Sequence, residues 1–234
     1  MHPRYLVFSD NEGCIIEAKG KEFNLEELAR LKRSLARSGV FAFAICTGRS
    51  VPYVEAMTQV LGIQRSEFPC VCEGGGVLYW PAQDRTELLV RPFPTASVLA
   101  QLPADLFRVE PGKMCCLSLY PRDPSGVQEL AEVVVPIVDR NLFTLRVSAA
   151  AVDITPLGVD KAFGIRKALE ATRYRSGTVV AVGDADNDLP MFDVAEFRAA
   201  PSNATQSVRA RADFVSRFPH TEGLIEILEN LQCR

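Results

Sequence analysis

Residues 178–190 read Thr-Val-Val-Ala-Val-Gly-Asp-Ala-Asp-Asn-Asp-Leu-Pro. The first five are apolar or β-branched, which is typical of a buried parallel strand. Gly183 permits a sharp turn, and Asp184, Asp186 and Asp188 then gather where a helix begins. Carboxylates this close stay ionised together only when a cation offsets their repulsion, and oxygen ligands at the carboxyl edge of a parallel sheet favour Mg²⁺ and a phosphorylated ligand. The alternative is an acidic loop that caps a helix N-terminus.

The composition excludes two classes of partner. The chain has 234 residues, of which 47% are hydrophobic, and 26 Lys and Arg stand against 29 Asp and Glu. This near-balance, without a basic run, argues against nucleic acid as a partner. No apolar stretch approaches the roughly 18 residues that span a bilayer, so we expect no membrane partner.

The pattern of the cysteines and the N-terminal segment both favour a reducing cellular compartment. None of the seven cysteines lies in a CxxC or Cys/His spacing. Buried free thiols in a reducing compartment explain them better than zinc or disulfides. The N-terminus leads into a short apolar segment without the pattern of a signal peptide. We therefore expect a cytoplasmic protein.

The order of the predicted elements is that of a split α/β domain. Apolar runs at 4–9, 40–46 and 69–72 alternate with helical patterns that Gly39 and Gly62 end, which predicts the βαβαβ start of a doubly wound parallel sheet. Short alternating runs at 87–90, 114–119 and 142–147, with one helix at about 127–140, then indicate a small α+β insert.

The α/β rhythm returns after the insert, with a helix at 160–171, the strand at 178–182 and further short elements to the C-terminus. We therefore predict a Rossmann-like core that closes around the insert. The predicted core comprises residues 1–81 plus 155–234, and the predicted cap comprises residues 82–154.

Polar side chains follow the core strands at the point where each strand ends. Asp10 ends the first strand as a potential nucleophile or metal ligand, and Thr47-Gly48-Arg49 follow the second strand with a hydroxyl and free N–H groups for phosphate oxygens. Lys161 opens the helix after the insert as a point charge for phosphoryl oxygens. With Asp184 and Asp188, these residues predict phosphoryl transfer.

In these motifs the chain resembles the haloacid dehalogenase superfamily of phosphohydrolases with a type IIB cap. The family pattern is a strand ending in DxDGT, a strand ending in T/S-G-R, a cap, a helix carrying Lys, and GDxxND. The match is strongest in residues 158–161, 183–188 and 201–205. The short cap is similar to that of archaeal-type phosphoglycolate phosphatases, and the turn at 73–76 is similar to the Glu-Asn-Gly turn of those enzymes and of mannosyl-phosphoglycerate phosphatases, with Gly74 in place of the asparagine. The chain also resembles Cof-like phosphatases.

The resemblance implies a role for each matching residue. Asp10 would attack phosphorus to form an aspartyl-phosphate and would also bind Mg²⁺. The backbone carbonyl of Glu12 and the carboxylate of Asp184 would be further metal ligands, and Asp188 would orient the metal site. Further residues would hold the phosphate or the substrate: Thr47, Gly48, Arg49, Lys161 and Asn203. An N-cap for the following helix is an equally good interpretation of Asn203.

Glu12 and Cys14 depart from the first motif of the family, which has an aspartate and a threonine there. The family aspartate is the general acid and base, and glutamate reaches one methylene further. An error near 1 Å in a catalytic group costs on the order of 10²-fold. We therefore expect intact binding of Mg²⁺ and phosphate, and the sequence leaves open whether turnover is intact. The alternatives are a phosphate-binding or regulatory protein and a phosphotransferase or mutase.

The insert contains the candidate residues for substrate recognition. Lys113 lies in a Pro-Gly loop and is the first candidate to reach a substrate carboxylate, with Arg91, Arg122 and Arg146 as competitors. The expected substrate is a small phosphorylated acid or sugar, and the sequence does not separate phosphoglycolate-like acids from glycosyl-phosphoglycerates or sugar phosphates. The oligomeric state stays open.

Overall fold

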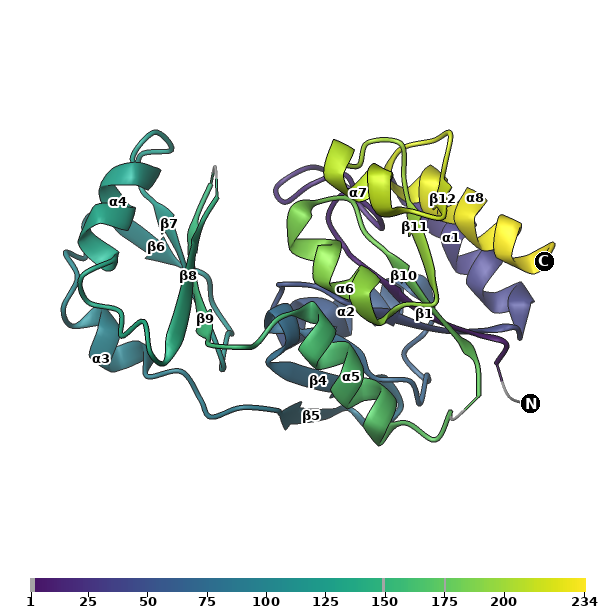
Figure 1. Cartoon of the computed structure of the whole chain (residues 1–234), viewed down its shortest axis with the longest axis horizontal. Helices are drawn as coiled ribbons and strands as arrows, with labels where there is room; N and C mark the ends of the chain where they lie inside the picture. The colour runs from purple at the N-terminus through teal and green to yellow at the C-terminus, as the bar shows by residue number, and fades with distance from the viewer. Residues whose placement is uncertain (1–2, 149, 175) are drawn as a thin grey trace.

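A five-stranded parallel sheet forms the centre of the larger part of the molecule (Figure 1). The computed structural model describes residues 3–148, 150–174 and 176–234. The strand order is β12-β11-β10-β1-β2, with the bounds β1 Tyr5–Ser9, β2 Phe41–Ile45, β10 Thr178–Val182, β11 Phe197–Ala200 and β12 Phe214–Val215. Ser9 at the end of β1 lies between Val182 and Ile45. The loops after these three strands therefore leave the sheet at one edge.

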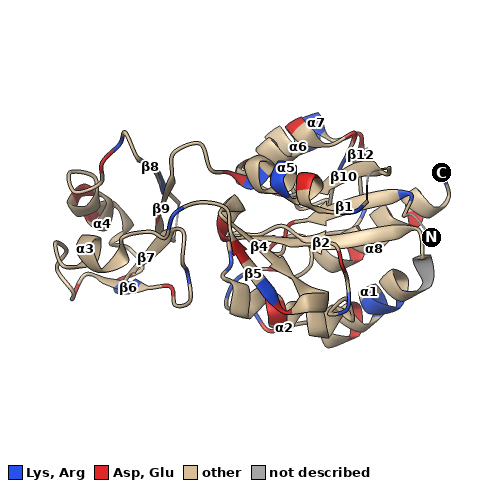
Figure 2. Ribbon diagram, turned by 90° about the horizontal axis from the view of Figure 1, so that it is seen from below, with Lys and Arg blue, Asp and Glu red and all other residues tan. Residues whose placement is uncertain are grey.

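Helices cover both faces of this sheet. Figure 2 shows α5 and α6 on one side, with α1, α2 and α8 on the other. Asn24 caps α1 through a 3.2 Å bond from the Glu27 amide, and the left-handed residues Gly39 and Gly62 end α1 and α2 as predicted. The helix bounds are α1 Leu25–Ser38, α2 Val51–Leu61, α5 Lys161–Ala171, α6 Leu189–Val194, α7 Gln206–Arg211 and α8 His220–Gln232; short 3-10 turns lie at η1 Glu73–Gly75, η2 Pro81–Gln83 and η3 Asp186–Asp188.

The third strand differs from the prediction. β3 (Cys70–Cys72) was expected to extend the parallel sheet, but only one parallel bridge, from Cys46 to Val71, joins it to the end of β2. β3 instead pairs antiparallel with β4 (Val77–Trp80), which pairs with β5 (Arg85–Leu88). The turn between β3 and β4 explains this, because Glu73 and Gly74 both have positive φ angles, 53° and 65°, and reverse the chain.

The insert has a sheet and a hydrophobic cluster of its own. Its four strands are antiparallel in the order β6-β7-β9-β8, and α3 and α4 pack on the side of the sheet away from the core (Figure 1). α4 ends earlier than the predicted helix at 127–140, because Pro136 cannot continue it. The bounds are α3 Thr95–Leu99, β6 Phe107–Val109, β7 Leu117–Pro121, α4 Val127–Val134, β8 Phe143–Val147 and β9 Val152–Pro156.

The two hydrophobic clusters bear on where the insert begins. Leu89 and Val90 pack against the core cluster, whereas Phe93 belongs to the cluster of the insert. The division into 1–81 plus 155–234 and 82–154 stays a prediction, and these contacts favour a first junction close to residue 92. No helix within the described residues is both long and apolar enough to cross a bilayer.

Candidate active site

Lys161 lies between two carboxylates at the carboxyl edge of the parallel sheet. Its Nζ is 2.7 Å from Oδ1 of Asp10, which directly follows β1, and 2.5 Å from Oδ1 of Asp188, in the turn after β10. All three side chains are buried, with at most 7% of each exposed. Burial alone would lower the pKa of Lys161, but the two carboxylates raise it well above its usual value. Lys161 is therefore held as a cation.

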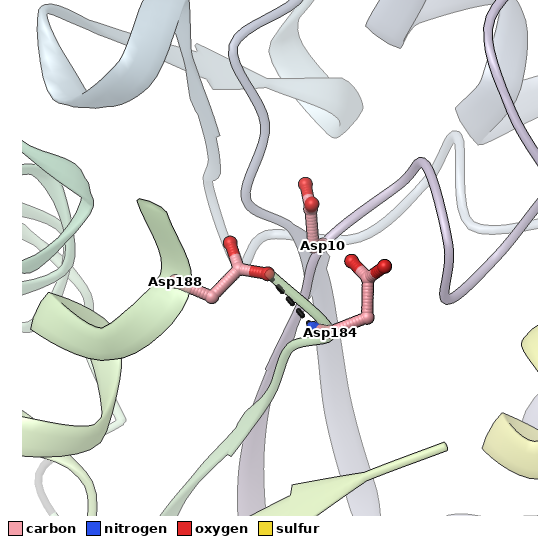
Figure 3. A group of neighbouring side chains, drawn as sticks. All are labelled: Asp10, Asp184 and Asp188. Atoms are coloured by element: carbon pink, nitrogen blue, oxygen red, sulfur yellow. Dashed lines mark hydrogen bonds between the residues drawn. The ribbon is translucent and has the colours of Figure 1, made fainter. Parts of the chain in front are cut away.

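A third carboxylate, that of Asp184, completes the cluster (Figure 3). Each of Asp10, Asp184 and Asp188 offers an oxygen within 4.8 Å of the others. Gly13 makes room for Asp184: a Cβ at Gly13 would lie 2.0 Å from its Oδ2. The family glycine at this position is thus required by the close approach of the two loops.

Burial and mutual repulsion oppose the ionisation of this cluster. Burial, followed by the charge of Asp188, raises the pKa of Asp184 to about 7. Burial and Asp188 also raise the pKa of Asp10 well above its usual value, although Lys161 opposes them. One lysine does not offset three carboxylates, and a divalent cation among these oxygens would do so. The donor set therefore fits Mg²⁺, which takes oxygen ligands.

Asp188 also fixes the backbone of its own turn. Its Oδ2 accepts a hydrogen bond from the amide of Asp184 at 2.9 Å (Figure 3). The same oxygen accepts a second one from the amide of Ala185 at 3.1 Å. Its two oxygens therefore do different work, since Oδ1 pairs with Lys161. This supports the predicted orienting role of Asp188.

Thr47, Gly48 and Arg49 form the loop that follows β2. Thr47 is buried, and its Oγ1 accepts a hydrogen bond from the Arg49 amide at 3.2 Å. The guanidinium of Arg49 forms an ion pair with Glu12 and lies 4.6 Å above the ring of Tyr53. The carboxylate of Glu12 is thus engaged by Arg49 and stands outside the aspartate cluster. Cys14 is a buried thiol whose pKa is raised, chiefly by burial and by Asp184.

The comparisons with known proteins place the chain in a family. Residues 108–228, more than half of the 234, match the family of haloacid dehalogenase-like hydrolases. The chain belongs to this family. The resemblance drawn from the sequence motifs is confirmed.

Two relatives that this chain matches are named phosphoglycolate phosphatases. The phosphoglycolate phosphatase of Methanopyrus kandleri is 28% identical over 240 residues, which cover 97% of this chain and 96% of that protein. Phosphoglycolate phosphatase 2 of Saccharolobus solfataricus is 38% identical over 78 residues, so the alignment spans about a third of its length, 33% of each protein. The hydrolase family and these names support the predicted class of enzyme, a phosphatase.

A solved structure shows the same fold. A crystal structure from Thermoplasma acidophilum covers 100% of both chains with a TM-score of 0.79 at 21% identity. The predicted class, a parallel α/β core with a smaller α+β part, is confirmed.

Asn203 uses its side chain within the protein. Its Nδ2 donates to the carbonyl of Gly13 at 3.1 Å and lies 3.4 Å from Oδ2 of Asp184, while its Oδ1 accepts from the amide of His220. The alternative interpretation as a helix cap is wrong, because Thr205 caps α7. Asn203 holds together three loops around Asp184, and its predicted contact with phosphate stays a prediction.

Lys113 lies at the site but has partners there. Its Nζ is 3.3 Å from Glu110 and donates to Ser118 Oγ, and 7% of its side chain is exposed. Glu110 in turn accepts from Tyr120 and contacts two cations of the core, Lys19 at 3.2 Å and Arg49 at 3.6 Å. The ammonium of Lys113 is therefore already engaged by Glu110 and Ser118.

Two cavities open between the core and the insert, with volumes of about 640 and 420 Å³. The larger is lined by Lys161, Gly48, Lys113 and Arg146, and the smaller by Asp10, Glu12 and Asp184 among others. Neither Arg91 nor Arg122 lines either cavity.

Several residues that join the insert to the core had no predicted role. Glu73 is 1% exposed, and its carboxylate accepts hydrogen bonds from the amides of Met114 and Cys115. Glu110 and Lys19 meet from positions 91 apart in the sequence. A glutamate in a glycine-rich turn was the only signal for Glu73, and nothing in the local sequence identifies Glu110.

Proposed function

We propose that this phosphatase is a Mg²⁺-dependent phosphomonoesterase that acts on a small phosphorylated acid through an aspartyl-phosphate. The observation that carries the proposal is the convergence of Asp10, Asp184, Asp188 and Lys161 at one edge of the sheet. Aspartate oxygens are suitable as both nucleophile and metal ligands, and the buried cation is suited to phosphoryl oxygens.

Asp10 is the proposed nucleophile because it directly follows β1 and its carboxylate lies in the cluster. It forms a bond to phosphorus while the bond from phosphorus to the leaving oxygen breaks. Lys161 stabilises the negative charge of the phosphoryl oxygens, and the Thr47 loop supplies N–H groups to them. Asp10, Asp184, Asp188 and the carbonyl of Glu12 would hold Mg²⁺, which when bound supplies Lewis-acid stabilisation of the phosphoryl group.

Glu12 is the proposed general acid and base. It would give its proton to the leaving oxygen and later take a proton from the water that hydrolyses the aspartyl-phosphate. Its ion pair with Arg49 works against the first step, because the carboxylate has to leave the guanidinium before it can serve the leaving oxygen. This observation favours a second candidate, an enzyme whose turnover is slow on poor leaving groups.

The proposed substrate is a small phosphorylated acid of the phosphoglycolate type. The phosphoglycolate phosphatase of Methanopyrus kandleri is similar along almost the whole chain, which supports this class over sugar phosphates. The cavities between core and insert carry cations from both parts, which suit an anionic substrate.

Phosphate release tests the proposal. Purified protein is given 2-phosphoglycolate, sugar phosphates and aryl phosphates, each with Mg²⁺ and again after exhaustive chelation. We expect Mg²⁺-dependent release, fastest with the phosphorylated acid, and none from the Asp10→Asn variant. Equal activity in Asp10→Asn would exclude this residue as nucleophile, and full activity after chelation would exclude the metal.

A further inference from the structure

The sheet of the insert has an apolar face and a polar face. In each strand alternate side chains belong to the hydrophobic cluster: Leu117 and Leu119 of β7, and Val152 and Ile154 of β9. Because successive side chains in a strand point to opposite faces, the residues between them share the other face. α3 and α4 cover the apolar face, so the polar face is directed toward the core (Figure 1).

One row of the polar face crosses three strands. Asp153 of the central strand β9 is in register with Ser118 of β7 on one side and with Arg146 of β8 on the other. The carboxylate of Asp153 accepts from Ser118 Oγ, and Ser118 is also bonded to Lys113. The carboxylate of Asp153 and the ammonium of Lys113 therefore both have partners.

Arg146 is the exception in this row. Throughout residues 3–148, 150–174 and 176–234, its guanidinium has no hydrogen bond or ion pair, although it lines the same cavity as Lys161 and Gly48. Of the four basic residues considered for the substrate carboxylate, Lys113 is already paired with Glu110 and Ser118, and Arg91 and Arg122 do not line this cavity. Only Arg146 combines a place at the cavity with an unused charge.

We propose that Arg146 binds the carboxylate of the phosphorylated acid while the phosphoryl group lies at Lys161 and the aspartate cluster. The proposal rests on the proposed function and specifies its substrate as a compound with a second, planar anion. A guanidinium offers paired N–H groups that match a carboxylate, which an ammonium such as Lys113 does not. The carboxylate would enter opposite Asp153, whose Ser118 bond holds it toward β7.

The test compares two substrates of equal length, 2-phosphoglycolate and ethyl phosphate, of which only the first has a carboxylate. We expect Arg146→Gln to lower kcat/KM for 2-phosphoglycolate by about 10- to 100-fold, the range of one charged hydrogen-bonding pair, and to leave ethyl phosphate unchanged. Arg146→Lys should recover part of the loss. Arg122→Gln removes the same charge from the same insert and should change neither substrate.

Three results would overturn the inference. They are equal loss on both substrates, no loss on either, or a selective loss in Lys113→Gln that Arg146→Gln does not show. If the wild-type protein releases phosphate from neither compound, the proposed function fails. The inference can then still be tested by calorimetry, which measures the binding of 2-phosphoglycolate and ethyl phosphate to wild type and to Arg146→Gln with Mg²⁺ present. If Arg146→Gln weakens the binding of 2-phosphoglycolate alone, the subsite is supported. If both proteins bind 2-phosphoglycolate equally, the subsite is refuted.

Discussion

The turn that begins at Glu73 connects the insert to the core, and replacing this residue by glutamine tests the connection. Glu73 is almost fully buried and holds a positive φ of 53°. Its Oε1 accepts from the Met114 amide at 3.0 Å, and its Oε2 accepts from the amides of Met114, at 2.9 Å, and Cys115, at 2.7 Å. The side chain thus satisfies two backbone donors in the loop between β6 and β7.

The expected loss follows from these two donors. A hydrogen bond to a charged group contributes about 1.5–3 kcal/mol and a neutral one about 0.5–1.5 kcal/mol. Glu73→Gln turns both bonds into neutral ones and directs its NH₂ at the Met114 amide, another donor. We expect the free energy of unfolding to fall by about 2–4 kcal/mol.

Urea denaturation at neutral pH measures this loss. Glu132→Gln, on the exposed side of α4, makes the same chemical change in the same insert and should be nearly neutral. Hydrogen exchange should become faster at the amides of 114 and 115 in Glu73→Gln alone. A loss no larger than that of Glu132→Gln, with unchanged exchange at these amides, would refute the reasoning.

Four further results are expected. Asp10→Asn should keep the fold, as judged by circular dichroism, and release no phosphate. Lys161→Met leaves two buried carboxylates uncompensated and should cost about 3–5 kcal/mol in urea denaturation as well as activity. Glu12→Asp should raise the rate on alkyl phosphates by up to about 10² if geometry limits turnover, and a lower kcat would show that the loop is adapted to glutamate. Burial raises the pKa of Glu110, but the charges of Lys113 and Lys19 outweigh burial and lower the pKa overall. Glu110→Gln should therefore lower the free energy of unfolding at pH 7, and this loss should shrink as the pH falls below the usual pKa range of glutamate.

The candidate active site at the carboxyl edge of the parallel sheet was predictable, because it depends on local sequence and on the rule that parallel strands end at a common edge. A buried strand followed by glycine and aspartates is visible in the chain, and parallel strands end at a common edge. Asp10 and Asp184 therefore meet although 174 positions separate them, as the register of β1 with β10 requires. The position of Lys161 does not follow from this rule, because the strand before it, β9, belongs to the antiparallel sheet of the insert. Its place at the start of the first helix after the insert was the signal in the sequence.

The insert was less predictable because its strands are short and its charges pair across loops. β6 and β9 went unrecognised, and β5 was assigned to the insert although it pairs with β4. Lys113 lines both cavities, and its contact with the substrate stays a prediction, but its pairing with Glu110 and Ser118 was not foreseen. Such pairings depend on how the insert lies on the core, which no local pattern specifies.

The turn at 73–76 contacts both the candidate active site and the insert. Its backbone donates to the Thr47 loop, from the Glu73 amide to the Arg49 carbonyl and from the Gly74 amide to the Thr47 carbonyl. A Cβ at Gly75 would lie 1.9 Å from the carbonyl of Asp160, the N-cap of the helix that Lys161 opens. Since the Glu73 carboxylate also holds the insert, one turn contacts the Thr47 loop, the N-terminal end of α5 and the insert. A change there should therefore reach substrate binding and catalysis together, which distinguishes it from Arg146, whose loss should affect only substrates with a carboxylate.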